Sequence, residues 1–156
     1  MNKSAGLLLY SIIGCGTFYL DRITKAWALR NAVDGLAVNQ FLSFDLVFNR
    51  GVTAGMLQSD NPAWFIVLSF VIGAIIIGLF GYMCYRWYHG HVIIGELFTL
   101  SGAISNLVDR YLFDGVVDFI HVTFLGYSFP IFNVADICIV LGVGILFFTS
   151  LKDDAS

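Results

Sequence analysis

The sequence predicts a membrane protein of the all-α class, a bundle of four transmembrane helices with a small antiparallel β-sheet on one side of the membrane. The first observation is composition: of 156 residues, 58% are hydrophobic and 12% are charged, whereas soluble domains carry about 25% charged residues. The second is that apolar runs recur four times, over about 5–29, 62–85, 92–110 and 132–151, each near the length of about 20 residues that crosses a bilayer. We therefore interpret residues 1–156 as a single integral-membrane domain.

Composition also excludes several classes of protein. The formal net charge is −3 and no basic cluster is present, so nucleic acid is not an expected partner. Cys15, Cys84 and Cys138 lie in apolar runs at unrelated positions, which indicates small core residues rather than a disulfide framework or a zinc site. His89 and His91 are too few and too close together to indicate a metal site. We expect a monomer that needs no metal and no cofactor.

The first span follows Lys3 and resembles a secretory signal, but no small-x-small cleavage site follows it. We therefore predict an uncleaved helix that continues to about Leu29. Asp21 and Lys25 stand at i, i+4 on one face, an order that suits an ion pair. Two interpretations stay open: plain anchoring at the interface, with Asp21 close to water, or a pair within the membrane boundary whose Lys25 reaches headgroups or substrate.

The segment 30–61 has a different pattern. Residues 42–48 alternate as a half-buried strand does, and a second short strand after Gly51 would complete a small sheet at the membrane surface. The second span, 62–85, carries no charge and begins with Pro62, which the first turn of a helix tolerates. An aromatic connector over 86–91 leads to the third span.

The third and fourth spans carry most of the polar residues of interest. Glu96 interrupts the third span, and we expect it to reach the interface on the side of the termini. Asn106, Asp109 and Arg110 end that span at i, i+3 and i+4, so they project from one side. The segment 111–131 is predicted to be a second non-spanning loop. Four spans place both termini on one side and 30–61 with 111–131 on the other, although a count of basic residues alone would invert this orientation.

Asp118 and Asp136 are acids in strongly apolar surroundings. A carboxylate there is costly unless it is neutral, paired or functional. Two that meet can share one proton and direct water onto a peptide bond. The structural alternative is that Asp118 caps a helix and Asp136 hydrogen-bonds within the bundle.

Five short motifs occur in one order between the apolar spans: Asp21-x-x-x-Lys25, Asn49-x-Gly51, Asn106-x-x-Asp109-Arg110, Val117-Asp118-Phe119 and Phe132-Asn133-x-Ala135-Asp136. Together they resemble the lipoprotein signal peptidase family, the bacterial signal peptidases II. The resemblance covers nearly the whole chain. Two serines, Ser101 and Ser105, stand where that family commonly has glycines, and Val52-Thr53-Ala54 replaces its usual small pair and aromatic residue.

The resemblance implies an aspartyl endopeptidase of the bacterial inner membrane, which cleaves prolipoproteins before a diacylglyceryl-modified cysteine. It implies cytoplasmic termini, a periplasmic sheet, and lipidated prolipoproteins and membrane lipids as partners. By the same resemblance, Asp118 and Asp136 are the catalytic dyad. The implied supporting or substrate-binding residues are Asp21, Lys25, Asn49, Gly51, Asn106, Asp109, Arg110, Asn133 and Ala135.

Two other functions compete with this one. A small proton- or cation-coupled transporter would use Asp136, Glu96 and Asp109 as its path, but the sequence has no internal repeat and its acids gather towards one side. A non-catalytic assembly protein would use the sheet as a docking surface, and its function would survive loss of both Asp118 and Asp136.

Overall fold

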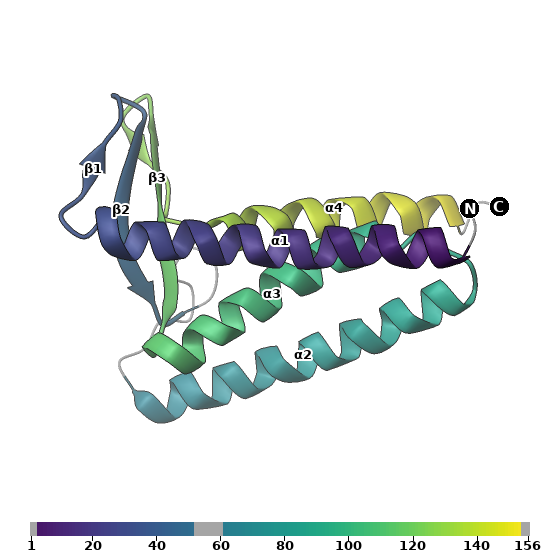
Figure 1. The fold of residues 1–156 in the computed structure, drawn as a ribbon. Coiled ribbons are helices and arrows are strands. Elements are labelled where there is room, and N and C mark those ends of the chain that lie inside the picture. Colours follow the sequence, from purple (N-terminus) through teal and green to yellow (C-terminus); the bar gives the residue numbers. More distant parts are fainter. Residues whose placement is uncertain (1–2, 52–60, 154–156) are drawn as a thin grey trace.

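A computed structural model describes residues 3–51 and 61–153. Its helices are α1 (Lys3–Asn31), α2 (Pro62–Tyr88), α3 (Ile94–Phe113) and α4 (Val134–Asp153). They run side by side, and a sheet covers one end of the bundle (Figure 1). α1 begins, and α4 ends, at the opposite end. The arrangement agrees with the expectation that both termini lie on one side and the sheet on the other.

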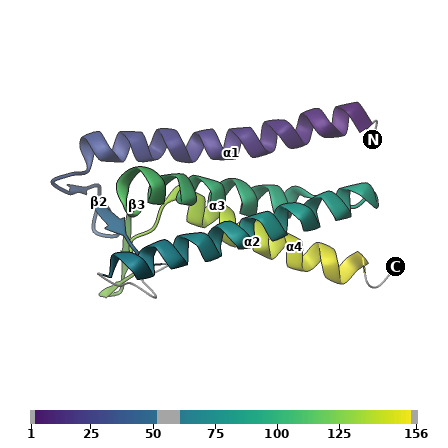
Figure 2. The same ribbon diagram turned by 90° about the horizontal axis from the view of Figure 1, so that it is seen from below.

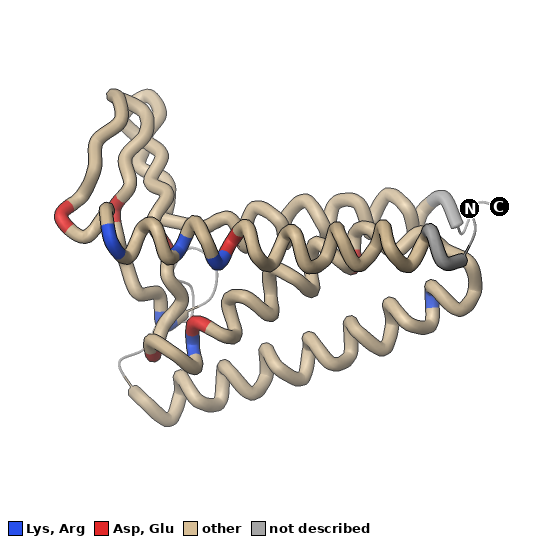
Figure 3. Tube along the Cα trace, viewed as in Figure 1, with Lys and Arg blue, Asp and Glu red and all other residues tan. Residues whose placement is uncertain are grey.

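Helices α2 and α4 are more apolar than α1 and α3. The helices Pro62–Tyr88 and Val134–Leu151 are long and apolar enough to cross a membrane by composition alone. α1 and α3 carry more charge, but Asp21, Lys25, Glu96, Asp109 and Arg110 are all buried inside the bundle. Figure 3 shows the charged positions concentrated near the sheet. The outer faces are apolar, as a lipid-facing surface requires.

α3 is the central helix. It packs against α1, α2 and α4, and it lies between α1 and α2 in both views (Figure 2). Glycines permit its close approach to α4: a Cβ on Gly95 would lie 2.7 Å from the Leu146 nitrogen, and one on Gly102 would lie 2.6 Å from the Ala135 carbonyl oxygen. Small residues serve this purpose in membrane helix packing. The contact at Gly102 fixes the first turn of α4 against α3.

The sheet has the order β1 (Leu36–Ala37), β2 (Leu42–Asn49), β3 (Val116–Phe124), β4 (Tyr127–Ser128), with antiparallel neighbours throughout. The predicted strand over 42–48 is confirmed as β2. The segment 111–131, predicted as a non-spanning loop, contains β3 and β4, and β3 is the long partner of β2. The second strand expected after Gly51, and the departures at Thr53 and Ala54, fall outside the described residues.

A small apolar core joins the sheet to α1. Ala28 of α1 and Ala32, the residue after that helix, pack against Phe119 of β3, and the rings of Phe44 and Phe119 lie 6.2 Å apart between centroids. A β-bridge between Ile120 and Phe132 pairs β3 with the segment that leads into α4. This packing holds β3 beside the start of α4.

Glu96 does not reach the interface that the sequence suggested. Its side chain is fully buried and pairs with Arg86 of α2, with Nη1 and Oε1 2.7 Å apart. The expectation failed because hydropathy shows that a charge lies in a span but not which neighbouring helix supplies its partner. A buried carboxylate needs such a partner.

Candidate active site

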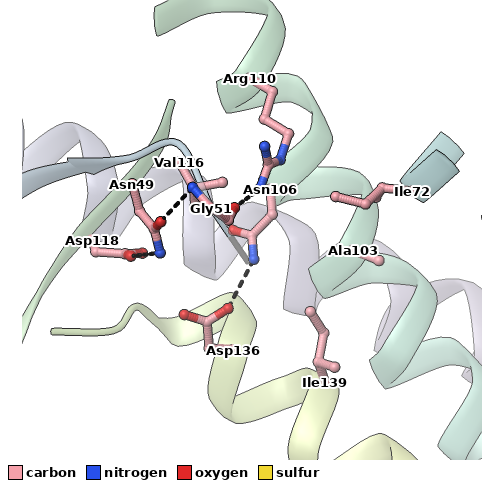
Figure 4. A pocket seen from close by; sticks show the side chains of 10 residues that line it. All are labelled: Asn49, Gly51, Ile72, Ala103, Asn106, Arg110, Val116, Asp118, Asp136 and Ile139. Carbon is pink, nitrogen blue, oxygen red and sulfur yellow. Dashed lines mark hydrogen bonds between the residues drawn. The ribbon is translucent and has the colours of Figure 1, made fainter. Parts of the chain in front are cut away.

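A cavity of about 160 Å³ lies where the sheet meets the helices, and it contains both carboxylates that the sequence singled out. Figure 4 shows Asp118 and Asp136 reaching it from different elements, β3 and α4. The residues that line it come from β2, α2, α3, β3 and α4 and from the turn after β2: Asn49, Gly51, Ile72, Ala103, Asn106, Arg110, Val116, Asp118, Asp136 and Ile139.

Asp118 is positioned by the register of β3, in which it pairs with Val47 of β2. Its side chain is 2% exposed. Oδ1 accepts a hydrogen bond from Asn133 Nδ2 at 2.6 Å and Oδ2 accepts one from Asn49 Nδ2 at 3.0 Å. Burial raises the pKa of Asp118 to about 7, the charge of Asp136 acts in the same direction, and the two amides oppose the rise. Asp118 can therefore hold a proton near neutral pH.

Asp136 is held by the first turn of α4. Its N–H donates to Asn133 Oδ1 at 2.9 Å, and the N–H of Asn133 donates back to Asp136 Oδ2 at 3.3 Å. This reciprocal pair is a capping box, in which Asn133 precedes the helix and the acid follows three residues later. Asn106 Nδ2 donates to the other oxygen, Oδ1, at 2.9 Å. Both oxygens of Asp136 are thus oriented, and Asn133 holds both acids.

Lys25 is the centre of a buried charge cluster behind the cavity. Its Nζ lies 2.8 Å from Asp21 Oδ2 and 2.7 Å from Asp109 Oδ2, and it donates to Asn106 Oδ1 at 2.7 Å. The last contact turns the amide of Asn106 towards Asp136. Because Lys25 and Asp21 are both fully buried, the interpretation that places them near water or headgroups is wrong, whereas the predicted i, i+4 ion pair is confirmed.

The end of β2 is tied to α3 by Arg110. Gly51 N–H donates to Asn49 Oδ1 at 2.9 Å, and Arg110 donates to the Gly51 carbonyl oxygen. The guanidinium also lies over the ring of Phe65, 5.4 Å from its centroid. These contacts hold the side-chain amide of Asn49, which donates to Asp118.

The structure brings all eleven predicted site residues together, including Ala135, whose backbone N–H donates to Asp21 Oδ1 at 2.7 Å. It adds two that the sequence analysis did not assign to the site. Arg22 forms an ion pair with Asp109, and Ser105 Oγ donates to Asp21 Oδ2 at 2.6 Å. A signal was present for Ser105, which stands four residues before Asp109 and so shares its helix face.

The arrangement suits hydrolysis by a carboxyl pair. Two acids line one small cavity, amide donors orient each of their four oxygens, and one acid holds a proton near pH 7. Within residues 3–51 and 61–153, no three His, Cys, Asp or Glu side chains group as a metal site would require. The Asp136 oxygens bond to Asn106 and Asn133 within the bundle, as the structural alternative proposed, but Asp118 lies on a strand and caps no helix.

Comparison with known proteins gives a consistent result. The family model described as signal peptidase (SPase) II matches residues 13–152. The lipoprotein signal peptidase of Clostridium novyi is 37% identical over 139 residues, which cover 86% of this chain and 91% of that protein. The lipoprotein signal peptidase of Bacillus subtilis is 34% identical over 151 residues, 94% and 95% of the two chains. A solved structure described as a bacterial membrane enzyme superposes with a TM-score of 0.73 at 27% identity, over 99% of this chain and 92% of that one.

Proposed function

The chain belongs to the signal peptidase II family and removes signal peptides from prolipoproteins, and we propose that it does so as an aspartic endopeptidase with Asp118 and Asp136 as its dyad. The observation that carries the proposal is the shared cavity, in which buried Asp118 has a pKa of about 7 beside Asp136. Two close carboxyls cannot both ionise cheaply, so one proton stays with the pair.

The reaction follows from that shared proton. The ionised carboxyl takes a proton from a water molecule, whose oxygen attacks the scissile carbonyl carbon. The protonated carboxyl donates its proton to the carbonyl oxygen, which gives a neutral tetrahedral intermediate. The proton on the first acid then passes to the leaving nitrogen as the C–N bond breaks, and the second acid recovers its proton from the intermediate. Apparent pKa values in the rate profile therefore belong to the pair.

The neighbouring polar groups orient the dyad in this proposal. Asn133 contacts both acids, Asn49 contacts Asp118, and Asn106 contacts Asp136. Lys25 orients Asn106 from behind. These residues act through the acids and do not exchange protons with the substrate.

We also propose that the chain is one integral domain with four transmembrane helices in the bacterial inner membrane. The helices α1 to α4 contain 29, 27, 20 and 20 residues, and about 20 suffice to cross. Burial of the acidic residues of α1 and α3, and of Lys25 and Arg110, supports spanning despite the lower apolarity of these helices. The termini would be cytoplasmic and the segments 30–61 and 111–131 periplasmic. A reporter fused after Lys152 should be active only in the cytoplasm, and periplasmic activity would contradict this orientation.

The substrates in this proposal are prolipoproteins with a diacylglyceryl cysteine, cleaved before that residue by a monomer lying among membrane lipids. Each buried acyl CH₂ contributes about 0.8 kcal/mol, so a lipidated precursor should be cleaved far faster than the same peptide without lipid. The test is purified protein with both precursors, and with Asp118→Asn and Asp136→Asn as inactive controls. Equal rates on the two precursors would refute the lipid requirement, and cleavage by either variant would refute the dyad.

The comparisons give no support to a proton- or cation-coupled transporter. The same purified protein in proteoliposomes should move no labelled cation. The Asp118→Asn and Asp136→Asn variants distinguish the protease from a non-catalytic assembly protein, because an assembly role would survive both substitutions.

A further inference from the structure

Ser105 is a fully buried hydroxyl on α3 that the proposed mechanism does not use. Its Oγ donates to Asp21 Oδ2 at 2.6 Å, which connects α3 to α1. The same Asp21 oxygen lies 2.8 Å from Lys25 Nζ. Lys25 also serves Asp109 and Asn106, so its position is a compromise among three partners. Within residues 3–51 and 61–153, the Ser105 hydroxyl bonds to Asp21 alone.

The other oxygen of Asp21 leads directly to the dyad. Oδ1 accepts the N–H of Ala135 at 2.7 Å, in the first turn of α4. The first N–H groups of a helix have no partner within the helix, so Asp21 supplies one from another helix. The next residue is Asp136. The direction of the Asp21 carboxylate therefore affects where the first turn of α4 presents the catalytic carboxyl.

The terminal torsion of Asp is broad and roughly two-fold, so the plane of the Asp21 carboxylate is set by its hydrogen-bond partners. With Ser105 on Oδ2 and Ala135 on Oδ1, the carboxylate is held from both sides. Without the hydroxyl, only Lys25 remains on Oδ2, and it is drawn towards Asp109 as well. The first turn of α4 then loses a fixed acceptor.

We propose that Ser105 is a positioning residue for peptide hydrolysis, which acts through Asp21 and the Ala135 N–H to align Asp136. The inference rests on the proposed function of the dyad. It concerns the chemical step rather than substrate binding, because Ser105 does not line the cavity. Removal of the hydroxyl should therefore lower kcat and leave KM unchanged.

Ser101 provides a matched control. It lies one turn earlier on the same helix and its Oγ also donates to α1, to the Gly14 carbonyl oxygen at 3.0 Å. That contact joins the same two helices but leads to none of the dyad residues. Ser101→Ala therefore reports the effect of losing one hydroxyl bridge between α1 and α3 without disturbing Asp21.

The experiment measures kcat and KM on a lipidated precursor for the wild type, Ser105→Ala, Ser101→Ala, Asp21→Asn and the double variant of Ser105 and Asp21. A hydrogen bond to a charged group contributes enough for about a tenfold effect or more. Ser105→Ala should lower kcat about tenfold with KM within twofold of the wild type, and Ser101→Ala should keep both values. In the Asp21→Asn background, Ser105→Ala should have less than a twofold further effect, because residues acting as a unit are not additive.

Three outcomes overturn the inference: unchanged kcat in Ser105→Ala, an equal loss in Ser101→Ala, or full additivity with Asp21→Asn. If Ser105→Ala does not fold, Ser105→Cys keeps a side chain of similar size with a weaker donor and is judged by the same criteria. If the wild type is active, Asp118→Asn is inactive and Ser105→Ala is fully active, this inference is rejected and the proposed function stands. A wild type that cleaves no lipidated precursor rejects the proposed function, and this inference with it.

Discussion

Substitution of Asp118 by Asn should abolish cleavage and should also change the stability of the protein in a direction that depends on pH. An amide can neither accept nor donate the proton that the dyad exchanges, so no cleavage is expected at any pH. The stability effect has a separate cause. The carboxyl is 2% exposed, and burial raises its pKa from the ordinary value of 3.8 to about 7.

The magnitude follows from that shift. A change of about 3 pKa units corresponds to about 4 kcal/mol, at 1.36 kcal/mol per unit. Because the folded state binds this proton more tightly than the unfolded state, the contribution to stability is complete below pH 3.8 and is lost as pH rises to about 7. Above pH 7 the wild type therefore carries the full cost of a buried charge, whereas the amide variant carries none of it.

The amide introduces a smaller cost of its own. Both oxygens of Asp118 accept from amide NH₂ groups, of Asn133 and Asn49, so the new NH₂ must face one of these donors. An unsatisfied buried donor costs about 1–3 kcal/mol. At pH 3.5, where the proton's contribution is almost complete, Asp118→Asn should consequently be less stable than the wild type by about that amount. At pH 8 it should be more stable, by roughly 1–3 kcal/mol.

The assay is thermal unfolding of both proteins in detergent at pH 3.5 and pH 8, with cleavage of a lipidated precursor measured alongside. Asp114→Asn is the control, because Asp114 is an exposed carboxylate in the left-handed position after α3, which Asn tolerates. The difference in free energy of unfolding between Asp114→Asn and the wild type should be the same at both pH values. The reasoning is refuted if Asp118→Asn shifts stability equally at both pH values, or if it retains substantial cleavage.

Three further predictions concern the surroundings of the dyad. Lys25→Met should destabilise the fold by about 3–5 kcal/mol, because it leaves buried Asp21 without its cation and buried Asp109 with Arg22 alone; unfolding in denaturant measures this, and a variant of near-normal stability would contradict the buried cluster. Gly102→Ala should lower both stability and cleavage, because the new Cβ would lie 2.6 Å from the Ala135 carbonyl oxygen. Gly73→Ala is the control and should lower neither, because a Cβ there would meet nothing within 4 Å. Equal behaviour of the two variants would argue against close packing of α3 on α4. Chelating agents should leave cleavage of lipidated precursor unchanged, and an inhibition reversed by added metal would argue against a carboxyl dyad.

Local sequence patterns predicted the helices well. The run 62–85 has no charge and starts with Pro62, and α2 begins at that residue and extends three residues beyond the predicted end. The alternation over 42–48 likewise predicted β2. In each case the pattern reflects how one element meets its surroundings, which a single stretch of sequence contains.

Partners in space were not predictable in the same way. β3 begins with the run Val116–Phe119, which is buried throughout and shows no alternation. Only its second half, residues 120–124, alternates apolar and polar side chains as an exposed strand does. Nothing in the sequence of β2 indicated that its partner follows two helices later. Lys25 was recognised as a partner of Asp21, but its contacts with Asp109 and Asn106 arise only from the packing of α1 on α3. The motif order supplied the site residues, and the packing supplied their connections.

The pairing of β2 with β3 also sets the order in which the chain becomes active during synthesis. Asn49 leaves the ribosome 69 residues before Asp118, with which it forms a hydrogen bond. Asp136 follows later still, in the first turn of the last helix. A nascent chain that has completed α1, β2 and α2 therefore contains neither carboxyl of the proposed dyad. Because Asp136 and Ile139 of the final helix line the cavity, the proposed dyad is complete only after the start of that helix has been made.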